Sequence, residues 1–348
     1  MFLFIQQWIS SVRARDTRKR EIRFPYGIIG YSLIHYSDKA CVCESISIMG
    51  RREMTDTKIE QVTAGQNRNE LNTLIRRFPA MTFKEQRVFL EGLYERYNRR
   101  EFVSPDPLEL LYRYDDTSDR EIAGFVASGL AYGNVQVIVR NAGIVLDRIG
   151  EPRRFVERTT EQELLSLFSG FRHRFTAAAD LAHFFLGIQG VFRRFGTLQS
   201  CFLHGFRPDH ETVLPALTGF LAALNPEGRR NFLLPDPRRN SVCKRLHLYL
   251  RWMVRKDDID PGGWEWVSPA HLIVPIDTHM FRICSIMNMT TRKTPDCKTA
   301  QEITESFRRY SPDDPARYDF ALTRVGMRGG SEQVSDRGNW REMRVKIQ

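Results

Sequence analysis

Asp277 stands at the end of an apolar run and at the start of an amphipathic one, within the segment Leu272 to Ile283. An aspartate at this point is expected to cap a helix, because its carboxylate accepts hydrogen bonds from backbone N–H groups of the first turn. Such bonds favour the ionised form and hold it rigid. A rigid carboxylate beside a substrate can stabilise a developing cation or orient a nucleophile. A purely structural cap explains the same residue type.

Lys244 is the second residue whose chemistry stands out, because it opens a helix expected over Ser241 to Val254, before the Asp277 segment. The positive end of a helix and the neighbouring Arg245 disfavour the ammonium form, and the neutral amine is the nucleophile. A surface lysine that contacts phosphate or solvent is the other interpretation, and the sequence leaves both open.

The elements that must position these residues are predicted to be helices. Apolar residues recur at helical spacing from about residue 69 onward, and strand-like alternation is nearly absent, which predicts an all-α fold. Gly124 and Gly129 lie inside one such helix and are costly there unless another helix packs closely. The expected helices include residues 83–94, a helix capped at Ser118, residues 135–149, 161–168, 179–195 and 210–224, and helices beginning near Asp277, 295 and 314.

Composition sets bounds on the class of protein. The chain has 348 residues and a net charge of +10, a surplus that suits a polyanionic partner, although a solubility role explains it equally. The six cysteines are scattered without a CxxC pair, so we expect a reduced, cytoplasmic protein with no metal site and no iron–sulfur cluster. No apolar stretch is long enough to cross a membrane.

Three segments are expected. Residues 1–68 have poor periodicity and a basic patch, and we interpret them as a weakly ordered extension or as sequence upstream of the true start. Residues 69–328 form the helical domain, and residues 329–348 a flexible tail. A monomer with no cofactor is expected.

The Asp277 segment resembles the aspartate-bearing segment of the helix-hairpin-helix base-excision DNA glycosylases, the superfamily of endonuclease III and the 8-oxoguanine glycosylases. The acid, His279 two positions later and Phe281 four positions later coincide with that pattern. The resemblance extends, more distantly, over about residues 115 to 328, including residues 126–135 and 307–326.

This resemblance implies a two-lobed helical bundle in which Lys244 is the nucleophile of a bifunctional enzyme and Asp277 its partner. Asn134 matches the polar turn that probes the gap left in DNA by an everted base. The long interval from position 244 to 277 is similar to that of the archaeal 8-oxoguanine glycosylases. The usual Gly-x-Gly of the hairpin is missing, but Asn240 tolerates a left-handed turn, so Asn240 and Ser241 are expected to contact phosphate.

Several further residues are candidates for contact with DNA. Trp264 and Trp266 lie in a Pro/Gly-rich loop and could stack an everted base, whereas Trp252 is expected in the core. Arg245 is a candidate phosphate or base contact. His279 is expected to steady the Asp277 turn, and His247 to be structural.

Residues 244–299 also resemble an uncharacterised bacterial family, through Lys244-Arg245-Leu246, the run from Leu250 to Arg255, and Arg292-Lys293. This second resemblance is the closer one and names no substrate. Three hypotheses follow: a DNA glycosylase that removes a damaged base such as 8-oxoguanine, with or without lyase activity; a non-catalytic nucleic-acid-binding protein of the same fold; or a helical scaffold in which Lys244 and Asp277 form a structural ion pair.

Overall fold

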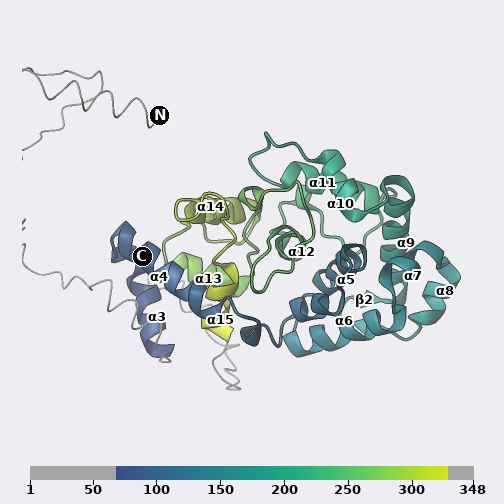
Figure 1. Cartoon of the computed structure of the whole chain (residues 1–348), viewed down its shortest axis with the longest axis horizontal. Coiled ribbons are helices and arrows are strands. Elements are labelled where there is room, and N and C mark those ends of the chain that lie inside the picture. The colour runs from purple at the N-terminus through teal and green to yellow at the C-terminus, as the bar shows by residue number, and fades with distance from the viewer. Residues whose placement is uncertain (1–67, 328–348) are drawn as a thin grey trace, which may run out of the picture. The chain divides into compact units, whose positions relative to one another are not determined.

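The computed structural model describes residues 68–327, and the helical prediction is confirmed over this range (Figure 1). All the described residues belong to one compact unit. The predicted extension at 1–68 and tail at 329–348 lie outside the described residues, apart from Arg68. The α-helices are α3 (Arg68–Arg77), α4 (Phe83–Tyr97), α5 (Thr117–Gly129), α6 (Val135–Ile149), α7 (Pro152–Arg158), α8 (Glu161–Leu167), α9 (Ala178–Phe195), α10 (Leu198–Gly205), α11 (Leu214–Leu224), α12 (Lys244–Val254), α13 (Thr278–Ile286), α14 (Cys297–Arg308) and α15 (Asp319–Met327).

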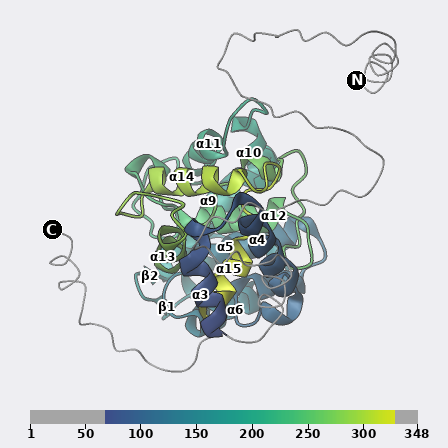
Figure 2. The same ribbon diagram turned by 90° about the vertical axis from the view of Figure 1, so that its left-hand side faces the viewer.

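The helices pack in two groups, one on either side of α12. Helices α5 to α11 pack on one another, with α9 contacting α7, α8, α10 and α11. On the other side, α15 packs against α3, α4 and α13, and Figure 2 shows α3, α4 and α15 side by side. Contact between α12 and α5 joins the two. The described strands are β1 (Arg172–His173) and β2 (Thr176–Ala177), which pair antiparallel with Arg172 opposite Ala177.

An aromatic cluster fills the junction between α5 and α12. The Phe125 ring lies 5.0 Å from the Tyr249 ring and 4.8 Å from the Phe184 ring. Gly124 allows this approach, since a Cβ there would lie 3.1 Å from Leu111 and 3.5 Å from Tyr249. The close packing that a glycine at this position predicts is therefore present.

Several helix ends differ from the sequence prediction. Helix α5 is capped by Asp116, whose carboxylate accepts from the N–H groups of Ser118 and Asp119, so Ser118 is not the cap. Helix α11 begins at Leu214 rather than near 210, and the chain from Asp314 makes turns before α15 begins at Asp319. Local sequence identifies helices better than it identifies their first residue, because several polar residues compete for the cap.

His247 is a buried titratable group in α12. Its side chain is 2% exposed, its Nδ1 has no hydrogen-bond partner among the described residues, and burial lowers the pKa of the imidazole to about 4. The expected structural role agrees with this position.

The folded protein should lose stability as the pH falls through the window between the ordinary and the buried pKa of His247. The unfolded chain takes up a proton there and the folded chain does not, so His247 alone removes roughly 3 kcal/mol between neutral pH and about pH 4. In urea denaturation, His247→Leu should reduce this pH-dependent loss by a similar amount. Parallel pH profiles for the two proteins would contradict the prediction.

Helices α9 and α11 cross closely at Gly187, where a Cβ would lie 2.2 Å from the Leu224 carbonyl oxygen. Gly187→Ala should therefore destabilise the protein by roughly 2 kcal/mol, because backbone cannot move aside cheaply. Gly190 on the same helix has nothing within 4 Å, and Gly190→Ala should stabilise by about 0.5–1 kcal/mol. Unfolding free energies of the two variants test the crossing, and equal effects would contradict it.

Candidate functional site

Lys244 and Asp277 meet in the structure, although they belong to different helices. Lys244 is the first residue of α12, and Asp277 is the N-cap of α13. The Lys244 Nζ lies 2.9 Å from Asp277 Oδ2, while Asp277 Oδ1 accepts the Met280 N–H at 2.8 Å. About a third of each side chain is exposed (32% and 33%). The prediction that Asp277 caps a helix is confirmed, and its second carboxylate oxygen forms an ion pair with the Lys244 ammonium.

The environment keeps the Asp277 carboxylate ionised. Burial opposes ionisation, but the Lys244 ammonium and the Met280 N–H outweigh burial, and the pKa of Asp277 is lowered. His279 adds a smaller contribution in the same direction. A carboxylate this close to the amine can accept a proton from it and return that proton later.

The pair faces a cavity of about 450 Å³. A volume of this size lies within the range of small-molecule ligand sites. Helices α12, α13 and α15 and the turn between α5 and α6 all contribute to its walls. The lining includes Asp106, Ala131, Tyr132, Gly133, Val135, Ile138, Lys244, Leu248, Arg251, Pro275, Asp277, Thr278, His279, Asp319, Phe320 and Thr323.

Two further acid–base pairs border this cavity. Arg251 Nη1 donates to Asp319 Oδ2 at 2.5 Å, and both side chains are buried, with at most 4% exposed. Arg324 pairs with Asp106 on a second wall. These groups escaped the sequence analysis. Lys244, Leu248 and Arg251 follow one face of α12, so helical spacing from Lys244 was the signal that pointed to Arg251.

Asn134 stands beside the cavity. Its side chain is exposed and accepts from the N–H groups of Gln136 and Val137, which makes it the N-cap of α6. The residues on either side of it, Gly133 and Val135, line the cavity. Gly133 has φ 106°, and a Cβ there would lie 3.0 Å from the Arg174 side chain. Both the backbone conformation and the close side chain favour glycine at this turn.

The turn before α12 has the conformation expected for Asn240. This residue is left-handed, with φ 56° and ψ 24°, and Ser241 Oγ accepts the Cys243 N–H at 3.2 Å. Ser241 lines a separate groove of about 700 Å³. Five arginines border the same groove: Arg229, Arg230, Arg238, Arg239 and Arg245. Arg229 pairs with Glu227 and Arg238 with Asp236.

Arg245 makes structural contacts within the protein. Its guanidinium donates to the carbonyl oxygens of Gly129 at 2.6 Å and Phe232 at 2.5 Å, and it lies over the rings of Tyr132 and Phe232. Burial lowers its pKa to about 10. The guanidinium therefore ties α12 to α5 and to the loop at Phe232, contacts that the sequence did not predict, and a DNA contact through Arg245 stays a prediction.

The two loop tryptophans, Trp264 and Trp266, lie in different environments. Trp264 is 3% exposed, packs on Phe202 and Tyr249, and donates from Nε1 to Glu121 Oε2 at 3.0 Å. Its predicted role in base stacking is wrong, because both the ring and its N–H are used in the core. Trp266 is 81% exposed and does not line the Lys244 cavity. Trp252 is buried, as expected.

A row of exposed aromatic residues adjoins the cavity and was missed. The Tyr132 ring lies 4.7 Å from the Phe232 ring, which lies 5.2 Å from the Phe175 ring. Phe232 and Phe175 are 41% and 67% exposed. Phe175 occupies the tight turn between β1 and β2, an element that the helical periodicity gave no reason to expect.

The described residues contain neither a metal-binding cluster nor a helix able to span a membrane. No cluster of three or more histidine, cysteine or carboxylate side chains within 68–327 is arranged to hold a metal ion. None of the helices in this part of the chain combines the length and apolar character that crossing a bilayer requires. Cys201, Cys243, Cys284 and Cys297 are free thiols.

Comparison with known proteins identifies one family. The model of the family described as "Protein of unknown function (DUF2400)" matches residues 106–328, which include the Lys244–Asp277 pair and every residue named above as lining its cavity. No curated protein and no solved structure matches the chain. On the extent of this match, the chain belongs to the DUF2400 family of proteins of unknown function.

Proposed function

We propose that this protein is a DNA base-excision glycosylase with lyase activity, in which Lys244 is the nucleophile and Asp277 its proton acceptor. The observation that carries the proposal is the 2.9 Å contact between an amine and a capped carboxylate on the wall of a cavity of ligand size. We also propose that the helices follow the two-lobed helix-hairpin-helix glycosylase arrangement, with Asn240 in the hairpin turn.

The chemistry needs only side chains that this chain supplies. Asp277 accepts a proton from the Lys244 ammonium, and the neutral amine attacks C1′ of an everted nucleotide. The new C–N bond forms as the glycosidic bond breaks, and its electron pair leaves with the base. The departing base takes the second proton of the nitrogen, and O4′ accepts the proton held by Asp277 as the sugar ring opens, which returns Asp277 to its carboxylate form. The product is a Schiff base between Lys244 and C1′.

Exposure distinguishes this pair from its neighbours. The Arg251–Asp319 pair is buried, whereas a third of Lys244 and of Asp277 remains accessible from the cavity. A pair that only stabilised the fold would gain nothing from facing a hollow, and exposed ion pairs contribute little stability. Accessibility therefore favours the catalytic hypothesis over the structural ion pair.

The surroundings suit DNA as the partner. The chain carries a net charge of +10, and five arginines border the groove that contains Ser241, of which Arg229 and Arg238 pair with carboxylates and, within residues 68–327, the other three do not. Such cations attract phosphates by counterion release. Exposed Asn134, Phe175 and Phe232 stand beside the cavity, where an opened duplex would need polar and stacking contacts.

Borohydride trapping tests the proposal. Duplexes that contain an abasic site or 8-oxoguanine should form a covalent adduct with the protein, because borohydride reduces the Schiff base to a stable amine. Lys244→Ala should abolish the adduct, and Asp277→Asn should slow its formation by about 10²–10⁴-fold. Lys298→Ala, an exposed lysine of α14, is the matched control and should trap normally.

Three outcomes would overturn the assignment. An adduct that persists in Lys244→Ala would exclude Lys244 as the nucleophile. DNA binding that survives both substitutions, with no base release by any form across a panel of lesions, would identify a non-catalytic binding protein. Absence of DNA binding at low salt would leave a helical scaffold for a different ligand.

A second prediction concerns the pair itself. Lys244→Ala should raise the pKa of Asp277, since it removes the strongest interaction that favours the carboxylate, and a carbon-13 NMR titration would measure this. The lowered pKa stabilises the fold above the ordinary carboxylate pKa, and this contribution disappears as the pH falls through the pKa of the folded state. The stability difference between wild type and Lys244→Ala should therefore shrink in acid. A difference that is independent of pH, as expected for Lys298→Ala, would contradict the prediction.

A further inference from the structure

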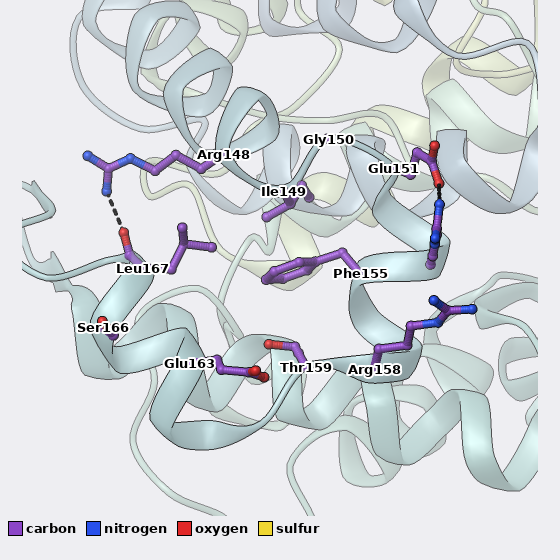
Figure 3. Close-up of a pocket in the computed structure, with 11 residues that line it drawn as sticks. Arg148, Ile149, Gly150, Glu151, Phe155, Arg158, Thr159, Glu163, Ser166 and Leu167 are labelled. Atoms are coloured by element: carbon purple, nitrogen blue, oxygen red, sulfur yellow. Dashed lines mark hydrogen bonds and ion pairs between the residues drawn. The ribbon is translucent and has the colours of Figure 1, made fainter.

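A third hollow lies away from the Lys244 cavity and from the groove that contains Ser241, between the end of α6 and helices α7 and α8 (Figure 3). Its volume is about 770 Å³, and it shares no lining residue with that cavity. In Figure 1, α7 and α8 lie on the opposite side of α12 from α13 and α15. We call this hollow the α7–α8 groove, and the glycosylase proposal assigns no role to it.

The floor of the groove is apolar. Ile149 from α6, Phe155 from α7 and Leu167 from α8 converge there, as Figure 3 shows. The Phe155 ring packs edge-to-face on the Phe185 ring, at 5.8 Å between centroids. Apolar side chains that remain partly exposed in a concave site favour an apolar anchor from a ligand.

Arginines border this floor. Arg148, Arg154 and Arg158 line the groove, and Arg148 and Arg158 are exposed. Arg154 pairs with Glu151 at 3.2 Å. Arg148 donates to the Leu167 carbonyl oxygen at 2.9 Å and, like Arg158, has no carboxylate partner among residues 68–327.

Among the described residues, the remaining carboxylate of the groove, Glu163, forms no ion pair with these arginines. Glu163 Oε2 accepts from the N–H and the hydroxyl of Thr160, at 2.8 Å and 3.0 Å, and so completes the capping box of α8. Two guanidinium groups without carboxylate partners therefore flank an apolar floor, which leaves the groove with a local positive charge.

We propose that the α7–α8 groove binds an acidic peptide segment of a partner protein. An apolar side chain of the peptide packs on Phe155 and Leu167, and its carboxylates pair with Arg148 and Arg158. A single-stranded nucleic acid fits less well, because stacking of bases requires free aromatic faces and the groove contains one ring, which already packs on Phe185.

Fluorescence polarisation on the full-length protein tests this site. The probe is a fluorescein-labelled peptide of alternating aspartate and phenylalanine or leucine. Two matched peptides replace either the apolar residues by serine or the aspartates by lysine. The acidic apolar peptide should bind, and both replacements should weaken binding at least about tenfold, because the groove offers both a charge and an anchor site.

The variants locate the binding. Arg158→Glu and Leu167→Ser should each weaken binding of the acidic apolar peptide at least about tenfold. Arg193→Glu reverses an exposed arginine of α9 outside the groove and should leave the affinity unchanged. Because the groove is separate from Lys244, Arg158→Glu should also trap abasic DNA normally, and Lys244→Ala should bind the peptide normally.

The outcomes separate this proposal from the glycosylase proposal. Peptide binding that is unchanged in both groove variants, or equal for the serine-substituted peptide, would overturn the peptide site. A single-stranded oligonucleotide that competes with the peptide and loses its affinity in Arg158→Glu would assign the groove to nucleic acid instead. Neither result depends on whether Lys244 forms a Schiff base.

Discussion

Two buried arginines at the C-terminal end of α12, Arg251 in its last turn and Arg255 at its C-cap, constrain the rest of this structure. Arg251 and Arg255 lie one turn apart with 3% of each side chain exposed, and they pair with Asp260, Asp314 and Asp319. Removing ionic groups from water costs several kcal/mol each, so every partner must be held in place for the buried charge to be tolerated. The pairs therefore fix α12 against the start of α15 and against the loop that follows α12. Lys244 begins the helix that these contacts orient, and its meeting with Asp277 depends on them.

The ion pairs around the cavity differ in how far they are exposed to it. The Arg251–Asp319 pair is enclosed, the Arg324–Asp106 pair is nearly so, and the Lys244–Asp277 pair is open to the hollow. Enclosed pairs are rigid, because breaking them would strand a charge in a poorly solvated place. A reactive pair needs rigid surroundings and an accessible face, and this arrangement supplies both. Burial raises the pKa of Asp319 and Arg251 opposes that rise, while smaller opposing effects of Asp277 and Lys244 on the same pKa couple Asp319 to the charges of the site.

The sequence predicted the helical class, the Asp277 cap, the left-handed Asn240 and the close approach at Gly124, because each follows from local rules of spacing or backbone conformation. It failed for Trp264, and it did not indicate the carbonyl contacts of Arg245. A loop rich in glycine and proline is usually at the surface, so nothing local indicated that Trp264 would enter the core beside Glu121. Arginine next to a candidate nucleophile suggested phosphate, yet its actual acceptors are carbonyl groups more than ten and more than one hundred positions distant in the chain. Contacts of that range are decided by tertiary packing.

The loop after α12 also explains the unusual interval between the amine and the acid. It folds back so that the Gly262 and Trp264 N–H groups satisfy the Trp252 and Met253 carbonyl oxygens, which the end of the helix would otherwise leave open. Trp264 of this loop enters the core and donates to the Glu121 carboxylate. The same carboxylate accepts from the Leu198 and Gln199 N–H groups at the start of α10. The part of the loop that contains Gly262 and Trp264 thus belongs to the interior. A deletion that removed these residues would leave the end of α12 and the start of α10 without partners that they have here.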